Sequence, residues 1–483
     1  MVIKMKSSIK HNYIYNTISQ LLLIIVPLIT TPYVSRVLGV ENVGYYSFAN
    51  SIVIYFVVFA TFGSTVFGQR NIAFYRDNKD KINDWFWNVF FFRIISSIIS
   101  FVIYIVFLIV SNNFNELFLL VSLNIFNVVV DITWFFQGLE NFKQIVFRNI
   151  IIKLLSTLSI FLVVKTSSDL LIYVLIVCGS TFIGNVSLWG ILIKYINKPK
   201  KISPFNGFKD MLLIFLPTIA IQIYAVLDKS MIGFITNSYY ANGCYEQAEK
   251  IARLALTVVT SVGTVILPKV ANLYHKKNIE EAKKFVYLSY RFTWFLALPI
   301  LFGLMSISST FIPIFLGNGY EDAIILLQIF SFLVLFVSLA HTTGNAYLIP
   351  TKQQNVYTIA VSVSAVLNLI LNLILIPKYS AKGAAIASII AEFVGCFIQL
   401  LYCFKTKQLE LKKVFKGMWK YLISSIIMFV IIASLKLYLD VTIFSLLLEI
   451  CTGVIVYGIV LLILKDEYCI DVLNRFMKFF KTK

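Results

Sequence analysis

The chain has 483 residues, of which 59% are hydrophobic and only 13% are charged, a composition that excludes a soluble globular core. Its net charge of +19 does not indicate binding to nucleic acid, because the basic residues lie in short loops beside long apolar stretches. We therefore expect a polytopic membrane protein.

About fourteen stretches are long and apolar enough to cross a bilayer, since a helix needs about 20 mostly apolar residues to do so. In chain order the predicted spans are 12–37, 45–69, 85–110, 116–137, 146–165, 169–193, 211–235, 241–268, 285–315, 321–349, 354–376, 383–404, 418–438 and 442–464. The sequence therefore predicts an all-α fold of about 14 transmembrane helices.

The positions of lysine and arginine predict the orientation of these spans. Most of the 42 basic residues lie at the two termini and at the even-numbered turns. The odd-numbered turns hold only Arg36, Lys165, Lys378, Lys382 and Lys436. By the positive-inside rule, we expect both termini and the even-numbered turns in the cytoplasm.

An internal repeat divides the predicted spans. Pro27 matches Pro217, the segment 44–49 (GYYSFA) matches 243–248 (GCYEQA), and Gly63 matches Gly263. Two parallel units of six helices are the arrangement of several secondary transporters, and chance similarity among apolar segments is the alternative. We expect a first six-helix lobe at 1–205, a second at 206–404, and two further transmembrane helices with a cytoplasmic tail at 405–483.

The chain lacks the common sequence motifs of nucleotide-binding, metalloprotease and serine-hydrolase sites. No Walker A, HExxH or GxSxG motif occurs, and the cysteines are scattered without metal-ligand spacing. The loops are too short for an extramembrane domain. We therefore expect no enzyme activity, no cofactor and no metal site, and we expect any function to reside in the spans.

Charged residues gather where span seven ends and span eight begins. They are Asp228, Lys229, Glu246, Glu249, Lys250 and Arg253. In a helix, Glu246–Lys250 and Glu249–Arg253 form i,i+4 pairs in the favourable acid-first order. Since a charge at the bilayer centre costs about 2.5–3.5 kcal/mol, this face should line a wet cavity or pack on another polar helix. We expect the cavity, with its cations placed to bind an anionic headgroup.

Two uncharged stripes follow helical spacing: Asn124, Asn127 and Asp131 on span four, and Ser364, Asn368 and Asn372 on span eleven. Such groups either line a cavity or join helices by hydrogen bonds. Further inward candidates are Arg36, Arg93, Lys153, Arg291, Gln20, Gln222 and Glu392. For Arg93, Lys153 and Arg291, each near a cytoplasmic helix end, we expect the charged group to snorkel to the membrane surface.

Three segments resemble the Wzx-type bacterial polysaccharide flippases of the multidrug/oligosaccharidyl-lipid/polysaccharide exporter superfamily. They are TPYVSRVLGVENVGYYSFANSI (31–52), DITWFFQGLENFK (131–143) and LDKSMIGFITNSYYANGCYEQAEKI (227–251). The resemblance covers nearly the whole chain, including the late segment IPKYSAKGAAIASIIAE (376–392).

The resemblance implies two six-helix lobes around a central cationic cavity in the bacterial plasma membrane. It implies a flippase that moves undecaprenyl-diphosphate-linked oligosaccharide to the outer leaflet by alternating access, for capsule or O-antigen synthesis. Membrane lipids, a glycan polymerase and glycosyltransferases are the implied partners. We expect substrate contacts from Arg36, Lys229, Lys250, Arg253 and Arg291, and polar lining from Asn124, Asn127, Gln222, Asn368 and Asn372.

Relatives of this kind are thought to use a proton or sodium gradient. That coupling role would fall to Asp131, Asp228, Glu246, Glu249 or Glu392, and the sequence does not choose among them. The 246–253 face departs from a purely cationic cavity, because it carries as many acids as bases.

Three other functions are open to an apolar chain of this kind. A multidrug exporter usually has twelve spans and an acid-dominated cavity, unlike this chain. A membrane glycan polymerase or ligase typically places catalytic residues on a long outer loop, and the predicted outer turns are short. A channel would need a filter-like segment, which is not apparent in the sequence.

Overall fold

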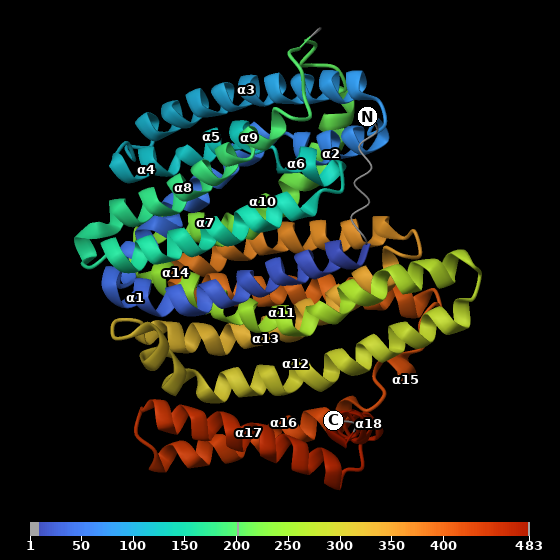
Figure 1. The fold of residues 1–483 in the computed structure, drawn as a ribbon. Helices are drawn as coiled ribbons and strands as arrows, with labels where there is room; N and C mark the ends of the chain where they lie inside the picture. Colours follow the sequence, from blue (N-terminus) through green and yellow to red (C-terminus); the bar gives the residue numbers. More distant parts are fainter. Residues whose placement is uncertain (1–8, 200–201, 482–483) are drawn as a thin grey trace. The chain divides into compact units, whose positions relative to one another are not determined.

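The computed structural model describes residues 9–199 and 202–481, without the side chains of residues 9–24, 217, 220–221, 262–265 and 475–481. The described residues form helices joined by short loops, and no strand occurs among them (Figure 1). They group into two compact units, 1–233 and 234–483. The units divide within α10, later in the chain than the predicted boundary after residue 205, so the predicted three-part division stays a prediction.

The first unit contains α1 to α10. Their bounds are α1 Ile9–Thr61, α2 Ser64–Phe74, α3 Lys79–Val110, α4 Glu116–Val121, α5 Leu123–Val130, α6 Thr133–Gly138, α7 Phe142–Val163, the 3-10 turn Ser167–Asp169, α8 Leu170–Ser187, α9 Trp189–Leu192 and α10 Phe208–Thr236, whose last residues belong to the second unit. Helix α1 packs against α3, α5, α7 and α8, and α2 packs against α3 and α6.

The second unit contains α11 to α18. Their bounds are α11 Tyr239–His275, α12 Ile279–Leu316, α13 Glu321–Thr343, the π-turn Gly344–Leu348, α14 Gln354–Lys405, α15 Leu411–Val414, α16 Met418–Leu435, the 3-10 turn Lys436–Tyr438, α17 Ile443–Ile463 and α18 Glu467–Lys481. Helix α13 packs against α11, α12 and α14, α11 also packs against α12 and α14, and α16 and α17 pack as a pair against α12.

The prediction of a polytopic all-α membrane protein is confirmed. Eleven helical segments of the described chain are long and apolar enough to span a membrane. Two of these are each broken once at a non-helical residue, α1 at Gly39 and α14 at Ser380, where the sequence predicts turns between successive spans. Helix α10 coincides with the predicted span 211–235.

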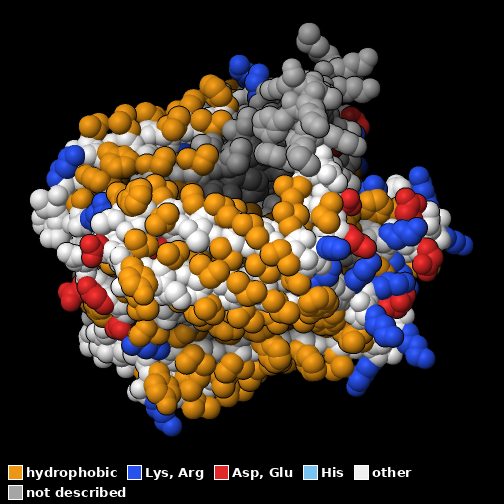
Figure 2. Space-filling model, turned by 90° about the horizontal axis from the view of Figure 1, so that it is seen from below, with side chains coloured by type: hydrophobic (Ala, Val, Ile, Leu, Met, Phe, Trp, Pro, Cys, Tyr) orange, Lys and Arg blue, Asp and Glu red, His pale blue; other side chains and the backbone are white. Residues whose placement is uncertain are grey.

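The outer surface of the second unit matches a lipid environment. The pair α16–α17 exposes large apolar residues on both helices, among them Ile426, Val430, Leu447 and Val454. In the face that Figure 2 shows, hydrophobic side chains cover the middle, while Lys and Arg side chains gather mainly at one edge. An apolar belt with basic residues at its border is the expected surface of a protein in a bilayer.

A buried ionic contact joins α18 to the rest of the second unit. Asp466, 1% exposed and just before α18, lies 3.4 Å from a guanidinium nitrogen of Arg291 on α12. The Tyr421 hydroxyl of α16 donates a hydrogen bond to the same carboxylate, and Glu467 lies 3.5 Å from Arg291. The side chain of Arg291 is 20% exposed and that of Glu467 is 72% exposed, so snorkelling of Arg291 to the membrane surface stays a prediction.

Candidate functional site

A pocket of about 380 Å³ with many polar lining residues lies in the first unit. Such a pocket is notable because the interior of a membrane protein is mostly apolar. It is lined by Asn50, Ile54, Val57, Thr61, Thr65, Arg93, Asn124, Asn127, Val128, Asp131, Thr181 and Asn185. These residues come from α1, α2, α3, α5 with its C-terminal residue Asp131, and α8. The prediction that Asn124, Asn127 and Asp131 share one face is confirmed, because all three line this pocket.

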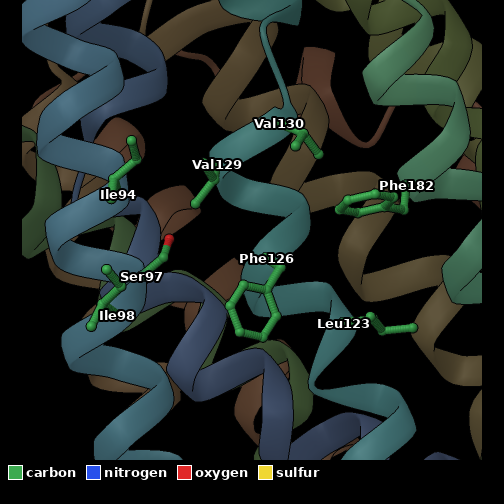
Figure 3. A pocket seen from close by; sticks show the side chains of 8 residues that line it. All are labelled: Ile94, Ser97, Ile98, Leu123, Phe126, Val129, Val130 and Phe182. Carbon is green, nitrogen blue, oxygen red and sulfur yellow. The ribbon is translucent and has the colours of Figure 1, made fainter.

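A second pocket, of about 400 Å³, lies on the opposite face of α5 and is apolar. Figure 3 shows its lining by Leu123, Phe126, Val129 and Val130 of α5, by Ile94, Ser97 and Ile98 of α3, and by Phe182 of α8. Helix α5 is therefore amphipathic in an unusual sense, since both of its faces border a pocket. Asn124, Asn127 and Val128 face the polar pocket, and Leu123, Phe126, Val129 and Val130 face the apolar one.

The polar pocket lies at a break in a membrane-spanning segment. Helix α5 ends at Val130, Asp131 is extended, and the chain resumes as α6 at Thr133. The Asp131 carboxylate caps the new start, because its Oδ1 accepts from the Thr133 backbone N–H at 2.9 Å and from the Thr133 hydroxyl at 2.6 Å. In lipid every backbone polar group needs a partner within the protein, so such a break requires side-chain donors.

Arg93 and two tryptophans supply those donors. Arg93 Nη1 donates to the carbonyl oxygens of Val128, at 3.1 Å, and Asp131, at 2.6 Å. The indole N–H of Trp189 donates to the Val130 carbonyl at 2.9 Å, and the indole N–H of Trp134 donates to the Asp131 carbonyl at 3.1 Å. The break is therefore a fixed part of the structure with satisfied hydrogen bonds.

The same guanidinium also holds the start of α2. Arg93 Nε donates to the Ser64 hydroxyl at 2.8 Å, and Nη2 donates to the Thr65 hydroxyl at 2.6 Å. Helix α2 begins there because Gly63 has a φ of 72°, a left-handed conformation that glycine adopts without strain. Since Arg93 is 1% exposed and bonded on all sides, the prediction that it snorkels is wrong.

One predicted ion pair of the charged face of α11, Glu249–Arg253, is present, while the cavity that this face should line stays a prediction. Glu249 is 5% exposed, and its Oε1 accepts from Nε of Arg253 at 2.7 Å and lies 2.7 Å from Nη2, as the i,i+4 spacing predicts. The Arg253 side chain is 50% exposed within its unit, and Glu392 of α14 lies within electrostatic reach of it. Glu246 and Lys250 on the same helix are half-buried.

The polar stripe of α14 joins the two halves of that helix. The Ser364 hydroxyl donates to the Ala391 carbonyl at 2.8 Å, and the Asn368 amide donates to the Ser388 hydroxyl at 3.2 Å. Asn372 donates to Asn368 at 3.1 Å, and both asparagines are fully buried. These bonds favour the helix-joining interpretation over cavity lining for Ser364, Asn368 and Asn372.

The remaining predicted site residues are spread over both units. In the first unit Arg36 on α1 and Gln222 on α10 are exposed, and Asp228 and Lys229 on α10 are half-buried. Lys153 on α7 is exposed, as snorkelling requires. The structure brings none of these four first-unit candidates, Arg36, Gln222, Asp228 or Lys229, into the lining of the polar pocket. The side chain of Gln20 lies outside those that the structure describes.

Sequence reasoning missed several polar residues of the pocket. Thr181 and Asn185 are an i,i+4 pair on α8, a spacing that places both on one helix face, whereas Thr61 and Thr65 lie on either side of the break between α1 and α2. Arg148 of α7 was also missed, although its Nη1 donates to the side-chain oxygen Oδ1 of Asn185 at 2.9 Å. The spacing of Thr181 and Asn185 is visible in the sequence, whereas the convergence of all these residues on one pocket depends on helix packing.

Comparisons with known proteins agree with this architecture. A family model described as polysaccharide biosynthesis protein matches residues 9–274, and one described as lipid II flippase MurJ matches residues 197–456. A protein of Escherichia coli (strain K12) described as an O-antigen transporter is 25% identical over 416 residues, covering 84% of this chain and 99% of that protein.

Two solved structures share the fold. The lipid II flippase MurJ in an inward closed conformation aligns with a TM-score of 0.70 at 19% identity, covering 92% of this chain and 97% of that one. An inward-facing multidrug resistance MATE family transporter of the MOP superfamily aligns with a TM-score of 0.58 at 14% identity, covering 80% of this chain and 98% of that one. At these identities the likeness concerns the fold alone.

Proposed function

Because the chain belongs to the polysaccharide biosynthesis protein family, we propose that it moves lipid-linked oligosaccharides across the membrane and is a transporter rather than an enzyme. The observation that carries this proposal is that a polysaccharide biosynthesis model and a lipid flippase model together match residues 9–456. The likeness to the O-antigen transporter over nearly its whole length supports the same substrate class.

The physical need for such a protein is plain. A glycan attached through a diphosphate carries many polar groups and charges, and each costs free energy in hydrocarbon unless it is paired or hydrated. The lipid part can stay in the bilayer throughout. A protein with a polar interior and an apolar outer surface satisfies both parts, and the first unit has such an interior in its polar pocket.

The finer assignment follows the resemblance of the sequence. The proposed substrate is undecaprenyl-diphosphate carrying an oligosaccharide repeat unit, moved from the cytoplasmic to the outer leaflet of a bacterial plasma membrane. Both termini lie in the cytoplasm, and a glycan polymerase and glycosyltransferases act in the same pathway. A proton or sodium gradient drives the movement through one of the acids Asp131, Asp228, Glu246, Glu249 or Glu392.

The proposal is tested by extracting lipids from a strain that lacks the gene. The expected result is loss of the surface polysaccharide, with a diphosphate-linked oligosaccharide accumulating on the cytoplasmic leaflet. Its mass would identify the glycan. If the lipid-linked sugar and the polysaccharide were both unchanged, the flippase proposal would be refuted, and drug efflux would then test a multidrug exporter on the same fold.

Complementation with variants tests the charged face of α11. Arg253→Ala should fail to restore the polysaccharide at normal membrane levels, because it removes a half-exposed cation from the proposed path of the anionic substrate. Arg76→Ala is a matched control, since Arg76 is also about half exposed and paired with a glutamate, 3.3 Å away, but lies in a loop. Full restoration by Arg253→Ala would remove Arg253 from the path.

A further inference from the structure

The polar pocket of the first unit is lined by neutral groups more than by charges. It holds four asparagines and three threonines against one arginine and one aspartate. Its ligand can be inferred from which of these groups still have hydrogen-bonding capacity. The charged groups would decide between an anion and a cation.

Arg93 has little capacity left for an anion. It makes four hydrogen bonds within the protein, to Ser64, Thr65 and the carbonyls of Val128 and Asp131, out of five N–H donors on a guanidinium. Its remaining attraction is shared with the Asp131 carboxylate, whose Oδ2 lies 3.9 Å from Nη1. A phosphate in this pocket would therefore gain little from Arg93, because most of its N–H donors already have partners and its charge lies beside the Asp131 carboxylate.

The pocket is equally unsuited to bind a cation. Oδ1 of Asp131 accepts two hydrogen bonds from Thr133, and the neighbouring guanidinium repels positive charge. Among the described residues there is no group of three or more His, Cys, Asp or Glu side chains that could hold a metal ion. At about 380 Å³ the pocket is also of the size that holds small organic molecules rather than a bare ion.

The neutral groups, by contrast, have capacity to spare. Asn127 is 7% exposed, lines the pocket, and its Oδ1 has no hydrogen-bond partner among the described residues. The hydroxyls of Thr61 and Thr181 donate to backbone carbonyls of their own helices, which leaves their oxygens as acceptors. The Asn185 oxygen accepts from Arg148, so its Nδ2 end is left to donate.

Acceptors placed beside a donor, without free charge, suit a ligand with several hydroxyl groups. Building on the proposed function, we propose that this pocket binds one or two sugar residues of the lipid-linked oligosaccharide. A hydroxyl both donates and accepts, so a sugar can pair with the hydroxyl oxygens of Thr61 and Thr181 and with the Asn185 amide. The apolar pocket on the other face of α5 lacks these groups and provides the control (Figure 3).

The test is titration of the purified full-length protein in detergent with the free oligosaccharide released by mild acid from the organism's lipid-linked pool. The wild type should bind it, and Asn127→Leu should weaken binding at least tenfold. Phe126→Leu, which alters the apolar pocket on the same helix, should bind as the wild type does. If Asn127→Leu does not fold, Thr181→Val is the second variant, because Thr181 is exposed and the substitution keeps its shape.

Competing probes decide the chemistry. Inorganic pyrophosphate and sodium chloride should not displace the oligosaccharide. Displacement by pyrophosphate would indicate an anion site, and displacement by sodium would indicate a cation site. Either result would overturn the proposal. So would wild-type affinity in both pocket variants, or no binding by the wild type.

Transport is measured separately, by flipping of the lipid-linked oligosaccharide in vesicles that contain the protein. Flipping without binding of the free oligosaccharide would refute the sugar site and leave the proposed function standing. Binding without flipping would refute the proposed function and leave the sugar site standing.

Discussion

Replacing Arg93 by Met should cost more stability than removing any surface arginine of the chain. Methionine fills similar space but donates no hydrogen bond, so the buried Val128 carbonyl loses the donor that Arg93 gives it. An unsatisfied buried group costs about 1–3 kcal/mol. The Asp131 carboxylate also loses its neighbouring charge, and breaking a buried pair costs about 3–5 kcal/mol in all. Because the Asp131 side chain is 29% exposed, we expect the lower end of that range.

The matched control is Arg70→Met. Arg70 pairs with Asp210 at 2.9 Å in the same unit, but the two side chains are 43% and 55% exposed. Such surface pairs contribute about 0–1 kcal/mol. Thermal unfolding of the purified proteins in detergent should therefore show a clearly larger fall in midpoint for the Arg93 variant. Equal midpoints would refute the conclusion that Arg93 stabilises the protein by joining the start of α2 to the end of α5.

Three other predictions concern separate features. Trp189→Phe removes the donor to the Val130 carbonyl at the end of α5 and should lower the free energy of unfolding by about 1 kcal/mol. Thermal unfolding measures this as a lower midpoint, and an unchanged midpoint would show that the hydrogen bond is dispensable. In α14, a Cβ on Gly395 would collide with the Ser364 hydroxyl, so Gly395→Ala should lower the free energy of unfolding by about 1–3 kcal/mol, and adding Ser364→Ala should recover part of it. A double variant no more stable than the single one would contradict this. In a background without native cysteines, a cysteine that replaces exposed Ser168 should react with an impermeant thiol reagent added to whole cells. A cysteine that replaces exposed Lys412 should react only after lysis, and the reverse pattern would show that the predicted topology is inverted.

The membrane-spanning architecture was predictable because it follows from local composition. Span lengths and turn positions come from runs of apolar residues, and the breaks at Gly39 and Ser380 fall in the turns that the sequence predicts. The break at Asp131 was not predicted. Residues 116–137 read as one continuous apolar span, and only donors from Arg93, Trp134 and Trp189, which lie outside this run or at its end, make the interruption tolerable.

The error over Arg93 has a related cause. Snorkelling was expected because the residue lies near a helix end, where a long side chain can usually reach the surface. The structure instead surrounds it with the start of α2 and the end of α5, which are 28 and 38 positions away in sequence. No spacing rule within α3 reports such partners, since the rule describes one helix and the partners belong to others.

The two asparagine stripes show most clearly what decides between structure and function in a membrane interior. Both follow helical spacing and both contain buried asparagines, so the sequence does not distinguish them. In α14 the Asn368 amide finds Ser388 in the second half of the same helix, and the bond joins the two halves. In α5, Asn127 lines a pocket, and its buried side-chain oxygen finds no partner among the described residues. Since an unpaired buried oxygen costs free energy in the empty protein, a ligand hydroxyl that pairs with it removes that cost on binding. The position of a partner, rather than the residue type, therefore separates an asparagine that joins helices from one that binds a ligand.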